Sequence, residues 1–328
     1  MISLLSQLPA PLAGNTDWPW SVNPSEYEDL TPDGSPWPKI SIVTPSYNQG
    51  EFLEKTISSI LSQGYPNLEY IIIDGGSSDN SIEIIKRYEK DLKYWCSEPD
   101  EGHYAAVNKG FSHATGEVFA WLNSDDMYCP WALKMVGSIF SRFSEVEWIS
   151  TLEQLVWDRS GSCITIKKMP GYSRQAFLDG GYFTRLGSRL GFIQQESTFW
   201  RSSLWEKVGG LGLKCGLAGD FDLWGRFFAN ADLYGVASPL GGFRYHGKNR
   251  SLQKGDYIAE AERSLGELRN LLGLPKHGTF PFSCNSLFWR LVKMVAGGIS
   301  RPYNAINLYP MSFDDGSNWE MKMDHFRA

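Results

Sequence analysis

A run of large apolar residues ends abruptly in polar ones at FAWLNSDDMY, residues 119–128. Two carboxylates, Asp125 and Asp126, stand side by side where a buried strand is predicted to end. Because adjacent carboxylates repel each other, this placement favours a divalent cation that neutralises them. Oxygen-rich sites suit Mg²⁺ or Mn²⁺, which bind through one or two carboxylates plus phosphates and water. The two side chains point in different directions, so we expect one direct ligand. A plain N-cap for a helix at 130–140 is the competing interpretation.

Three earlier apolar runs in the chain also end in polar loops. The four runs lie at 39–44, 68–74, 92–97 and 117–122. Helix-like segments separate them at 51–63, 81–90 and 103–114. Strand, polar loop and helix thus repeat in order, which predicts a βαβ series, a parallel sheet and right-handed crossovers.

The polar loops after these runs are candidate ligand-binding segments, because open parallel sheets bind ligands beyond the carboxyl ends of their strands. Polar side chains that could converge there are Asn48, Asp74, Asp79, Glu98, Asp100, Asn108 and Asp125. The competing interpretation is that they are turn and capping residues, a role that suits Asp79 and Ser81. The chain has no G-x-x-x-x-G-K-[ST], G-x-G-x-x-G or G-x-S-x-G motif, which argues against a P-loop NTPase, a dinucleotide oxidoreductase and a serine hydrolase.

The rest of the chain is less regular. Residues 1–38 read as an irregular arm that packs on the body through Trp18, Trp20 and Trp37. A hairpin is predicted around residues 159–161, and extended structure at 232–246. A strand is predicted at 194–201, and helices at 203–210, 219–230 and 256–272.

Composition bounds the class of protein. The chain has 328 residues, of which 42% are hydrophobic, enough for one large α/β domain with additions. Its net charge of −6 argues against nucleic acid as the main partner. Five widely spaced Cys without C-x-x-C argue against a disulfide framework or a zinc site and favour a cytoplasmic location. We find no secretory signal and no window of roughly 18–20 apolar residues.

The stretch 285–303 contains no acid and carries Arg290, Lys293 and Arg301. Such an apolar, cationic segment suits contact with an anionic membrane surface, at the inner face of the membrane and near a lipid-linked acceptor. A helix that packs over the sheet explains the same pattern equally well.

Taken together, the quoted motifs resemble a known family. ISIVTPSYNQGEFLEKTISSILSQGYPNLEYIIIDGGSSDNSIEIIKRY and SEPDEGHYAAVNKGFSHATGEVFAWLNSDD resemble the family 2 glycosyltransferases with a GT-A fold. The likeness covers residues 39–140 and continues more weakly to about residue 250. It implies an α/β fold with a central, mostly parallel sheet flanked by helices. It also implies a catalytic domain at 39–250, with a nucleotide-sugar half (39–126) and an acceptor half (127–250). Residues 251–328 are expected to form a helical extension.

The resemblance also implies residue roles. Pro45, Tyr47 and Asn48 would line the nucleoside pocket, with Asp74 at the base. NSDD stands at the metal-binding D-x-D position of the family, so Asn123 takes the first place and Asp125 is the expected metal ligand. The further donor-binding residues implied are Asn108, Lys109 and Ser124. Asp220 in AGDFDLW matches the usual general base, and His246 in RYHGKNRS a His that helps to hold the metal or the diphosphate.

Two features of the sequence qualify the resemblance. Relatives usually carry an acid where this chain has Ala105. The chain also lacks the Q-x-x-R-W of processive polysaccharide synthases, which favours transfer of a single sugar.

The expected reaction is an inverting, metal-dependent transfer of one sugar, from a UDP-sugar by preference, to a glycan or lipid-linked acceptor in cell-surface polysaccharide synthesis. Asp220 is the expected base and Glu196 a weaker alternative. Ala105 keeps open a non-catalytic, nucleotide-sugar or glycan-binding role. Nucleotidyl transfer to a sugar phosphate is a third hypothesis, although TPSYNQG lacks the basic residue that it would need.

Overall fold

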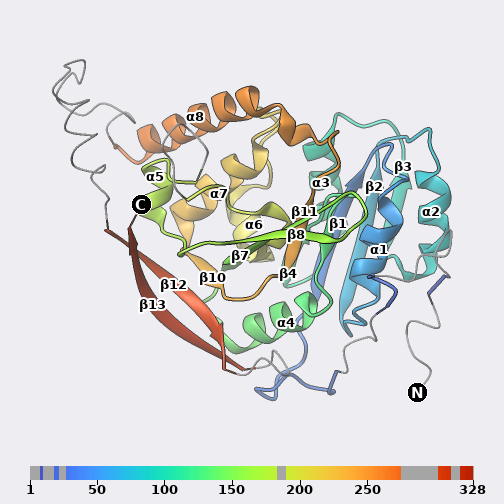
Figure 1. Cartoon of the computed structure of the whole chain (residues 1–328), viewed down its shortest axis with the longest axis horizontal. Coiled ribbons are helices and arrows are strands. Elements are labelled where there is room, and N and C mark those ends of the chain that lie inside the picture. The colour runs from blue at the N-terminus through green and yellow to red at the C-terminus, as the bar shows by residue number, and fades with distance from the viewer. Residues whose placement is uncertain are drawn as a thin grey trace.

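The structure is a computed structural model, which describes residues 8–9, 18–21, 27–182, 190–274, 302–311 and 318–327. Within these residues the strands form one nine-stranded sheet and one four-stranded sheet (Figure 1). The large sheet has the spatial order β13 (Trp319–Arg327), β12 (Pro302–Pro310), β10 (Leu233–Val236), β6 (Trp148–Thr151), β9 (Phe199–Arg201), β4 (Val118–Trp121), β1 (Ile40–Ser46), β2 (Leu68–Asp74) and β3 (Tyr94–Ser97). The small sheet has the order β5 (Met127–Tyr128), β11 (Gly241–Arg244), β7 (Glu153–Trp157) and β8 (Cys163–Lys168).

The helices of the described residues lie on both faces of the large sheet. They are α1 (Leu53–Leu61), α2 (Ser81–Arg87), α3 (His103–Ser112), α4 (Ala132–Arg142), α5 (Arg174–Leu178), α6 (Ser202–Val208), α7 (Gly219–Asn230) and α8 (Lys254–Leu271). Short 3₁₀ turns are η3 (Glu89–Asp91), η4 (Gln195–Ser197) and η5 (Arg250–Leu252).

The predicted parallel sheet is confirmed for the four apolar runs. β1 pairs in parallel with β2 and β4, and β2 pairs in parallel with β3. The carboxyl ends of β1 and β4 therefore lie together at one edge of the sheet. β9 runs antiparallel between β4 and β6, which joins the regular first half to the less regular second half. This is the mixed α/β arrangement expected of the GT-A fold.

The alternation of side chains along the strands explains the two helical layers. Ile40 and Ile42 of β1 pack with α1, α2 and α4 on one face, whereas Val43 packs with the helices on the other. The second face is rich in aromatic rings, and in α8 it includes Ala261, Leu265 and Leu268. Figure 1 shows α8 alongside α5 and α7, with α1 and α2 next to β1–β3.

Several second-half predictions are confirmed and others differ in detail. The hairpin is β7–β8, but the preceding residues Trp148–Thr151 form β6 in the large sheet. The segment predicted as one strand at 194–201 divides into η4 and β9. Residues 251–328, predicted as a helical extension, contain α8 but also the paired strands β12 and β13. These strands extend the sheet because β12 pairs with β10. The proposed domain boundaries stay predictions.

The described parts of the N-terminal arm touch the body through tryptophans. Trp37 is buried and makes edge-to-face contacts with Tyr27 and Tyr65. Trp18 packs against the small cluster that contains Met127. Of the stretch 285–303, residues 285–301 lie outside the described residues. Within the described part of the chain, no helix is both long and apolar enough to cross a membrane.

Gly110 sets the distance between α3 and the sheet. A Cβ added there would lie 2.3 Å from Val43 Cγ1 of β1.

Gly110→Ala should therefore lower the free energy of unfolding by about 1–3 kcal/mol, the usual cost of overpacking a core. The matched control is Gly266→Ala in α8, where an added Cβ meets nothing within 4 Å. There the helix propensity of Ala should raise stability by up to about 1 kcal/mol. Urea denaturation measures both, and a stable Gly110→Ala protein would contradict the tight contact.

Candidate active site

A cavity of about 720 Å³ lies beyond the carboxyl ends of β1 and β4. Pro45, Ser46 and Tyr47 line it at the end of β1, and the run Asn123–Asp126 lines it after β4. Its other walls include Gln195 and Glu196 of η4, Asp220 of α7, Tyr257 of α8 and the loop residues Lys248 to Ser251. The cavity thus combines five of the predicted donor-binding residues with the predicted base. These five are Pro45, Tyr47, Asn123, Ser124 and Asp125.

The loop that carries Asp125 is held by hydrogen bonds to side chains of α1 and η4. The Thr56 hydroxyl of α1 lies 2.9 Å from the carbonyl oxygen of Ser124 and 2.7 Å from that of Asp126, so it can donate one hydrogen bond shared by the two oxygens. Asn123 Nδ2 donates to Asp126 Oδ2 (3.0 Å) and to Gln195 Oε1 (3.2 Å). These bonds fix the backbone of a four-residue turn. The helix that follows begins at Ala132 and has no side-chain cap, so Asp125 and Asp126 are not its N-cap.

Asp125 and Asp126 have separate surroundings, as the sequence predicted from their adjacency. Asp126 is buried, and its Oδ1 accepts a hydrogen bond from the backbone N–H of Arg244 (2.8 Å). Burial, and then the nearby charges of Asp125 and Glu196, raise the pKa of Asp126 well above its usual value. The adjacent carboxylates therefore avoid repulsion in part because the buried one favours its neutral form.

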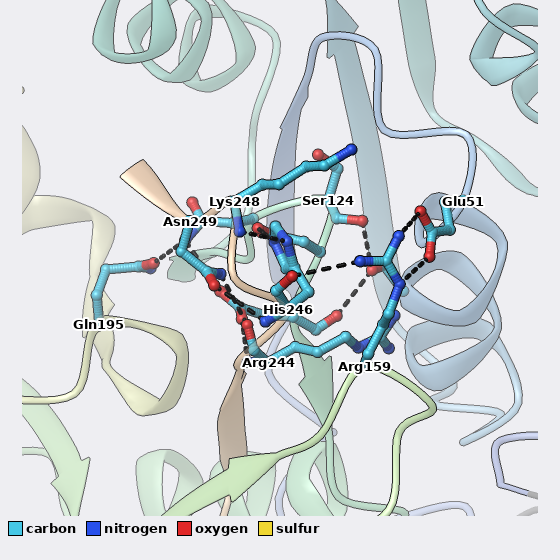
Figure 2. Close-up of polar contacts among 12 residues, drawn as sticks. Glu51, Ser124, Arg159, Gln195, Arg244, His246, Lys248 and Asn249 are labelled. Atoms are coloured by element: carbon cyan, nitrogen blue, oxygen red, sulfur yellow. Dashed lines mark hydrogen bonds and ion pairs between the residues drawn. The ribbon is translucent and has the colours of Figure 1, made fainter. Parts of the chain in front are cut away.

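Asp125 pairs with His246. His246 Nε2 lies 3.0 Å from Asp125 Oδ2, and the side chains of His246 and Asp125 are 3% and 18% exposed. The Lys248 backbone N–H donates to His246 Nδ1 (3.4 Å; Figure 2). This leaves Nε2 to donate to Asp125. The imidazole also stacks on Phe52, with ring centroids 4.5 Å apart. In this arrangement His246 orients Asp125, and direct ligation of a metal by its ring stays a prediction.

The loop that carries His246 is tied to neighbouring elements. Figure 2 shows Arg159, from the β7–β8 turn, forming a fork of hydrogen bonds with Glu51 (2.6 and 2.5 Å) and reaching the carbonyl oxygen of His246 (3.3 Å). Asn249 donates to the carbonyl oxygen of Arg244 (2.8 Å) and accepts from the His246 N–H (3.0 Å). The imidazole is therefore held by contacts on both sides of the loop.

The fit of a divalent cation rests on Asp125 and on Asn123. Asn123 lines the cavity, and its buried Oδ1 has no hydrogen-bond partner among the described residues. An amide oxygen beside a carboxylate is the donor chemistry that Mg²⁺ and Mn²⁺ prefer. No group of three or more His, Cys, Asp and Glu side chains in the described ranges is arranged to hold a metal. The residues therefore fit a cation whose remaining ligands come from phosphate oxygens and water.

Asp220 lies at the first turn of α7 and faces the cavity. Burial raises the pKa of this carboxyl group to about 6, although hydrogen bonds from the Phe221 N–H and Tyr257 lower it in part. Glu196 also lines the cavity, and burial, together with the charges of Asp220 and Asp125, raises its pKa to about 7. Carboxylates with pKa values in this range suit proton transfer near neutral pH.

Two predicted donor-binding residues, Asp74 and Asn48, hold neighbouring loops in place and do not line the cavity. Asp74 is fully buried, and it accepts hydrogen bonds from the N–H groups of Gly76 and Ser77 and the hydroxyls of Ser77 and Ser97. Asn48 has a positive φ of 52° and accepts a hydrogen bond from the Ser78 N–H (2.8 Å). Both organise the loops after β1 and β2, and their contact with a nucleoside stays a prediction.

Asn108 and Lys109 do not line the cavity either. Asn108 Nδ2 donates to the carbonyl oxygen of Leu211 (2.9 Å), and its Oδ1 accepts from the Leu211 N–H (3.0 Å). Lys109 forms an ion pair with Glu98. Ala105 lies on the same helix and is also outside the cavity lining.

The structure adds cavity residues that the sequence did not single out. His103, Lys248 and Arg250 line the cavity beside its carboxylates. Burial, and then the charge of Arg250, lowers the pKa of His103 to about 4, so its ring is neutral at pH 7. The basic residues in HGKNR were a local signal for Lys248 and Arg250. Tyr257 had no such signal, because α8 must fold back over α7 to bring it there.

Known proteins are similar to this chain in sequence. A family model described as glycosyl transferase family 2 matches residues 41–146. An uncharacterized glycosyltransferase of Mycobacterium tuberculosis (strain H37Rv) is 31% identical over 184 residues, 56% of this chain and 66% of that protein. The putative teichuronic acid biosynthesis glycosyltransferase TuaG of Bacillus subtilis is 37% identical over 94 residues, 28% of this chain and 37% of its own.

The fold also matches a solved structure. The crystal structure of S. aureus TarS 1–349 in complex with UDP-GlcNAc covers 77% of each chain, with 15% identity and a TM-score of 0.52. The sequence match spans just under two thirds of the Mycobacterium tuberculosis protein. The family model, a relative described as a glycosyltransferase and the fold all point to the same class of protein. Residues 41–146 of this chain belong to glycosyl transferase family 2, and the chain has the GT-A fold.

Proposed function

We propose that this chain transfers a single sugar, with inversion, from a nucleotide-diphosphate sugar to a glycan or lipid-linked acceptor, assisted by Mn²⁺ or Mg²⁺. The observation that carries the proposal is that one cavity holds both Asp125, at the end of β4, and Asp220, at the start of α7. The first suits the diphosphate of a donor and the second suits the hydroxyl of an acceptor.

The comparisons guide the choice of substrates. TarS, whose fold this chain shares, has been crystallised with UDP-GlcNAc and with UDP, so UDP-sugars are the first donors to test. TuaG is described as acting in teichuronic acid biosynthesis, which favours cell-surface polysaccharide synthesis as the setting.

The cavity residues have distinct parts in this proposal. Tyr47 is 62% exposed at the mouth of the cavity, where its ring and Pro45 can pack against a nucleoside. Asp125, oriented by His246, would hold the cation together with the Asn123 amide oxygen. A bound cation would offset the negative charge that builds on the departing diphosphate.

Asp220 would act as the general base. It takes the proton of the acceptor hydroxyl as that oxygen forms a bond to the anomeric carbon of the donor sugar. The bond from that carbon to the diphosphate breaks at the same time, and the nucleoside diphosphate leaves with the electron pair. Attack from the side opposite to the leaving group inverts the anomeric centre.

The pKa of the base predicts the pH dependence of transfer. Because burial raises the pKa of Asp220 to about 6, protonation should inactivate the base as the pH falls through 6. We expect kcat/KM to fall about tenfold per unit below that pH. In Glu196→Gln the fall of kcat/KM should still be centred near pH 6. If kcat/KM of the native chain instead falls near pH 7, and this fall is absent from Glu196→Gln, the base is Glu196, whose pKa is about 7.

The test of the proposal is release of nucleoside diphosphate from a panel of UDP-sugars, with Mn²⁺ or with EDTA. The proposal expects UDP release that requires the cation. In a separate reaction with UTP and a sugar 1-phosphate, release of pyrophosphate would instead indicate nucleotidyl transfer. Binding of donor without any release, with water or with sugar acceptors, would favour the non-catalytic role suggested by Ala105.

A further inference from the structure

We propose that helix α8 is a positioning element of the active site, in which Tyr257 and Glu260 hold Asp220 and the loop before it in the geometry needed for proton transfer. This inference rests on the proposed function in taking Asp220 as the base. The helix lies outside residues 41–146, the part of the chain that the family model matches. Tyr257 and Glu260 act through Asp220, so they are positioning residues.

The first contact joins α8 to the carboxylate itself. The Tyr257 hydroxyl lies 3.3 Å from Asp220 Oδ1 and 3.4 Å from Oδ2, so it can donate a hydrogen bond shared by the two oxygens. Both side chains line the cavity. A hydroxyl donor at this place restrains the carboxylate and favours its ionised form, which is the form that a base requires.

The second contact joins α8 to the loop that leads into α7. The Glu260 carboxylate accepts hydrogen bonds from the N–H groups of Gly216 (3.2 Å), Leu217 (2.8 Å) and Ala218 (2.9 Å). Ala218 is the N-cap residue of α7, and Asp220 follows two residues later. One carboxylate thus fixes three consecutive peptide groups directly before the base.

The contacts fall on one face of α8. Ser264 continues the row, because its Oγ lies 3.6 Å from Cys215 Sγ. Residues 257, 260 and 264 are spaced by three and four, which places them on the same side of a helix. The row runs from Asp220 back along the 215–218 loop, so α8 holds that segment at successive points.

A second helix holds the same loop from another side. Tyr104 of α3 donates to the carbonyl oxygen of Leu217 (2.5 Å) and accepts from the Gly219 N–H (3.0 Å). The loop before Asp220 is therefore bound by both α3 and α8. The titratable groups that interact with Asp220 are Tyr257 of α8, Tyr104 of α3 and Glu196 of η4. The charged side chain of Arg250 in η5 lines the same cavity and interacts with Tyr104.

The first experiment measures Asp220 directly and needs no substrate. The full chain is labelled with ¹³C at Asp carboxyl carbons, and the Asp220 signal is the one absent from Asp220→Asn. Loss of the hydroxyl donor in Tyr257→Phe should raise the pKa of Asp220 by about one unit. Tyr309→Phe is the matched control, because Tyr309 donates to Asp324 (2.6 Å) in the β12–β13 hairpin and should leave the Asp220 titration unchanged. An unchanged Asp220 titration in Tyr257→Phe would overturn the contact.

The second experiment separates positioning from a structural role. With the UDP-sugar that the native chain hydrolyses fastest, Glu260→Gln should lower kcat about tenfold, because the base is misplaced, and leave KM within about twofold. The control Glu267→Gln, an exposed acid on the same helix, should change neither. In Tyr257→Phe, the pH below which kcat/KM falls should rise by the same amount as the Asp220 pKa measured by NMR. A Glu260→Gln protein with native kcat, or with a raised KM alone, would contradict the positioning role.

The two experiments also distinguish failure of this inference from failure of the proposed function. If no sugar is transferred by the native chain but Tyr257→Phe shifts the Asp220 titration, the contact holds and the assignment of Asp220 as a base fails. If transfer depends on Asp220 but neither α8 variant affects it, the proposed function stands and the α8 inference is wrong.

Discussion

Replacing Asp220 by Asn should lower the rate of sugar transfer by about 10²–10⁴-fold, the usual contribution of a general base. Asn keeps the size of the side chain but cannot accept the proton of the acceptor hydroxyl. Donor binding should stay within about twofold of native, because Asp220 would face the acceptor. Single-turnover transfer and donor titration measure the two quantities separately.

The matched control is Asp222→Asn on the same helix. Asp222 forms an ion pair with Arg226 (2.9 Å) and does not line the cavity, so transfer by this variant should stay close to native. Equal losses in both variants would indicate damage to α7, and native transfer by Asp220→Asn would remove Asp220 from the mechanism.

The same substitution should stabilise the protein at neutral pH. The pKa of Asp220 is raised from 3.8 to about 6, so its favourable contribution is fully present below pH 3.8 and is lost as the pH rises through 6. At pH 7.5 the native chain therefore carries the cost of a buried charge that Asn lacks. The full shift corresponds to about 3 kcal/mol, and solvent in the cavity should reduce this to about 1–2 kcal/mol. Urea denaturation at pH 7.5 should show the gain, which should shrink at pH 4.

Replacing Asp125 by Ala should abolish the part of donor hydrolysis that depends on Mn²⁺, a loss of about 10²-fold or more. We assign the cation to this carboxylate because the neighbouring Asp126 is buried and already accepts hydrogen bonds from Asn123 and from the Arg244 N–H. His246→Asn should have a smaller effect, about tenfold, because it removes the partner that orients Asp125. Release of UDP at a range of Mn²⁺ concentrations is the measurement.

The control for lost charge is Asp91→Ala, an exposed acid in η3 outside the cavity, which should hydrolyse donor at the native rate. Hydrolysis by Asp125→Ala with unchanged dependence on Mn²⁺ would show that the cation binds elsewhere or takes no part.

The sequence predicted the regular first half of the fold because its signals are local. Apolar runs, polar loops and amphipathic segments each span few residues, and they gave β1 to β4 and α1 to α3 close to their observed bounds. The same local signals predicted that Asn48, Asp74 and Asp125 lie at one edge of the sheet, whereas Pro45 and Tyr47 came from the family resemblance. The roles given to them stay predictions.

Two kinds of feature could not be read from the sequence. Asn48 and Asp74 hold the loops through hydrogen bonds to backbone N–H groups, and the same residue types also bind nucleosides, so residue type alone does not separate the two roles. Tyr257 and the pairing of β12 with β10 depend on contacts between segments far apart in the chain, for which a single sequence carries no local pattern.

The most direct test of the central claim is calorimetric titration of UDP into the native chain, first with Mn²⁺ and then with EDTA. The account predicts that UDP binds with Mn²⁺ and that EDTA weakens binding at least tenfold, because Asp125 and the diphosphate would share the cation. If UDP, GDP and dTDP all fail to bind under both conditions, the cavity beside Asp125 is not a nucleotide-sugar site.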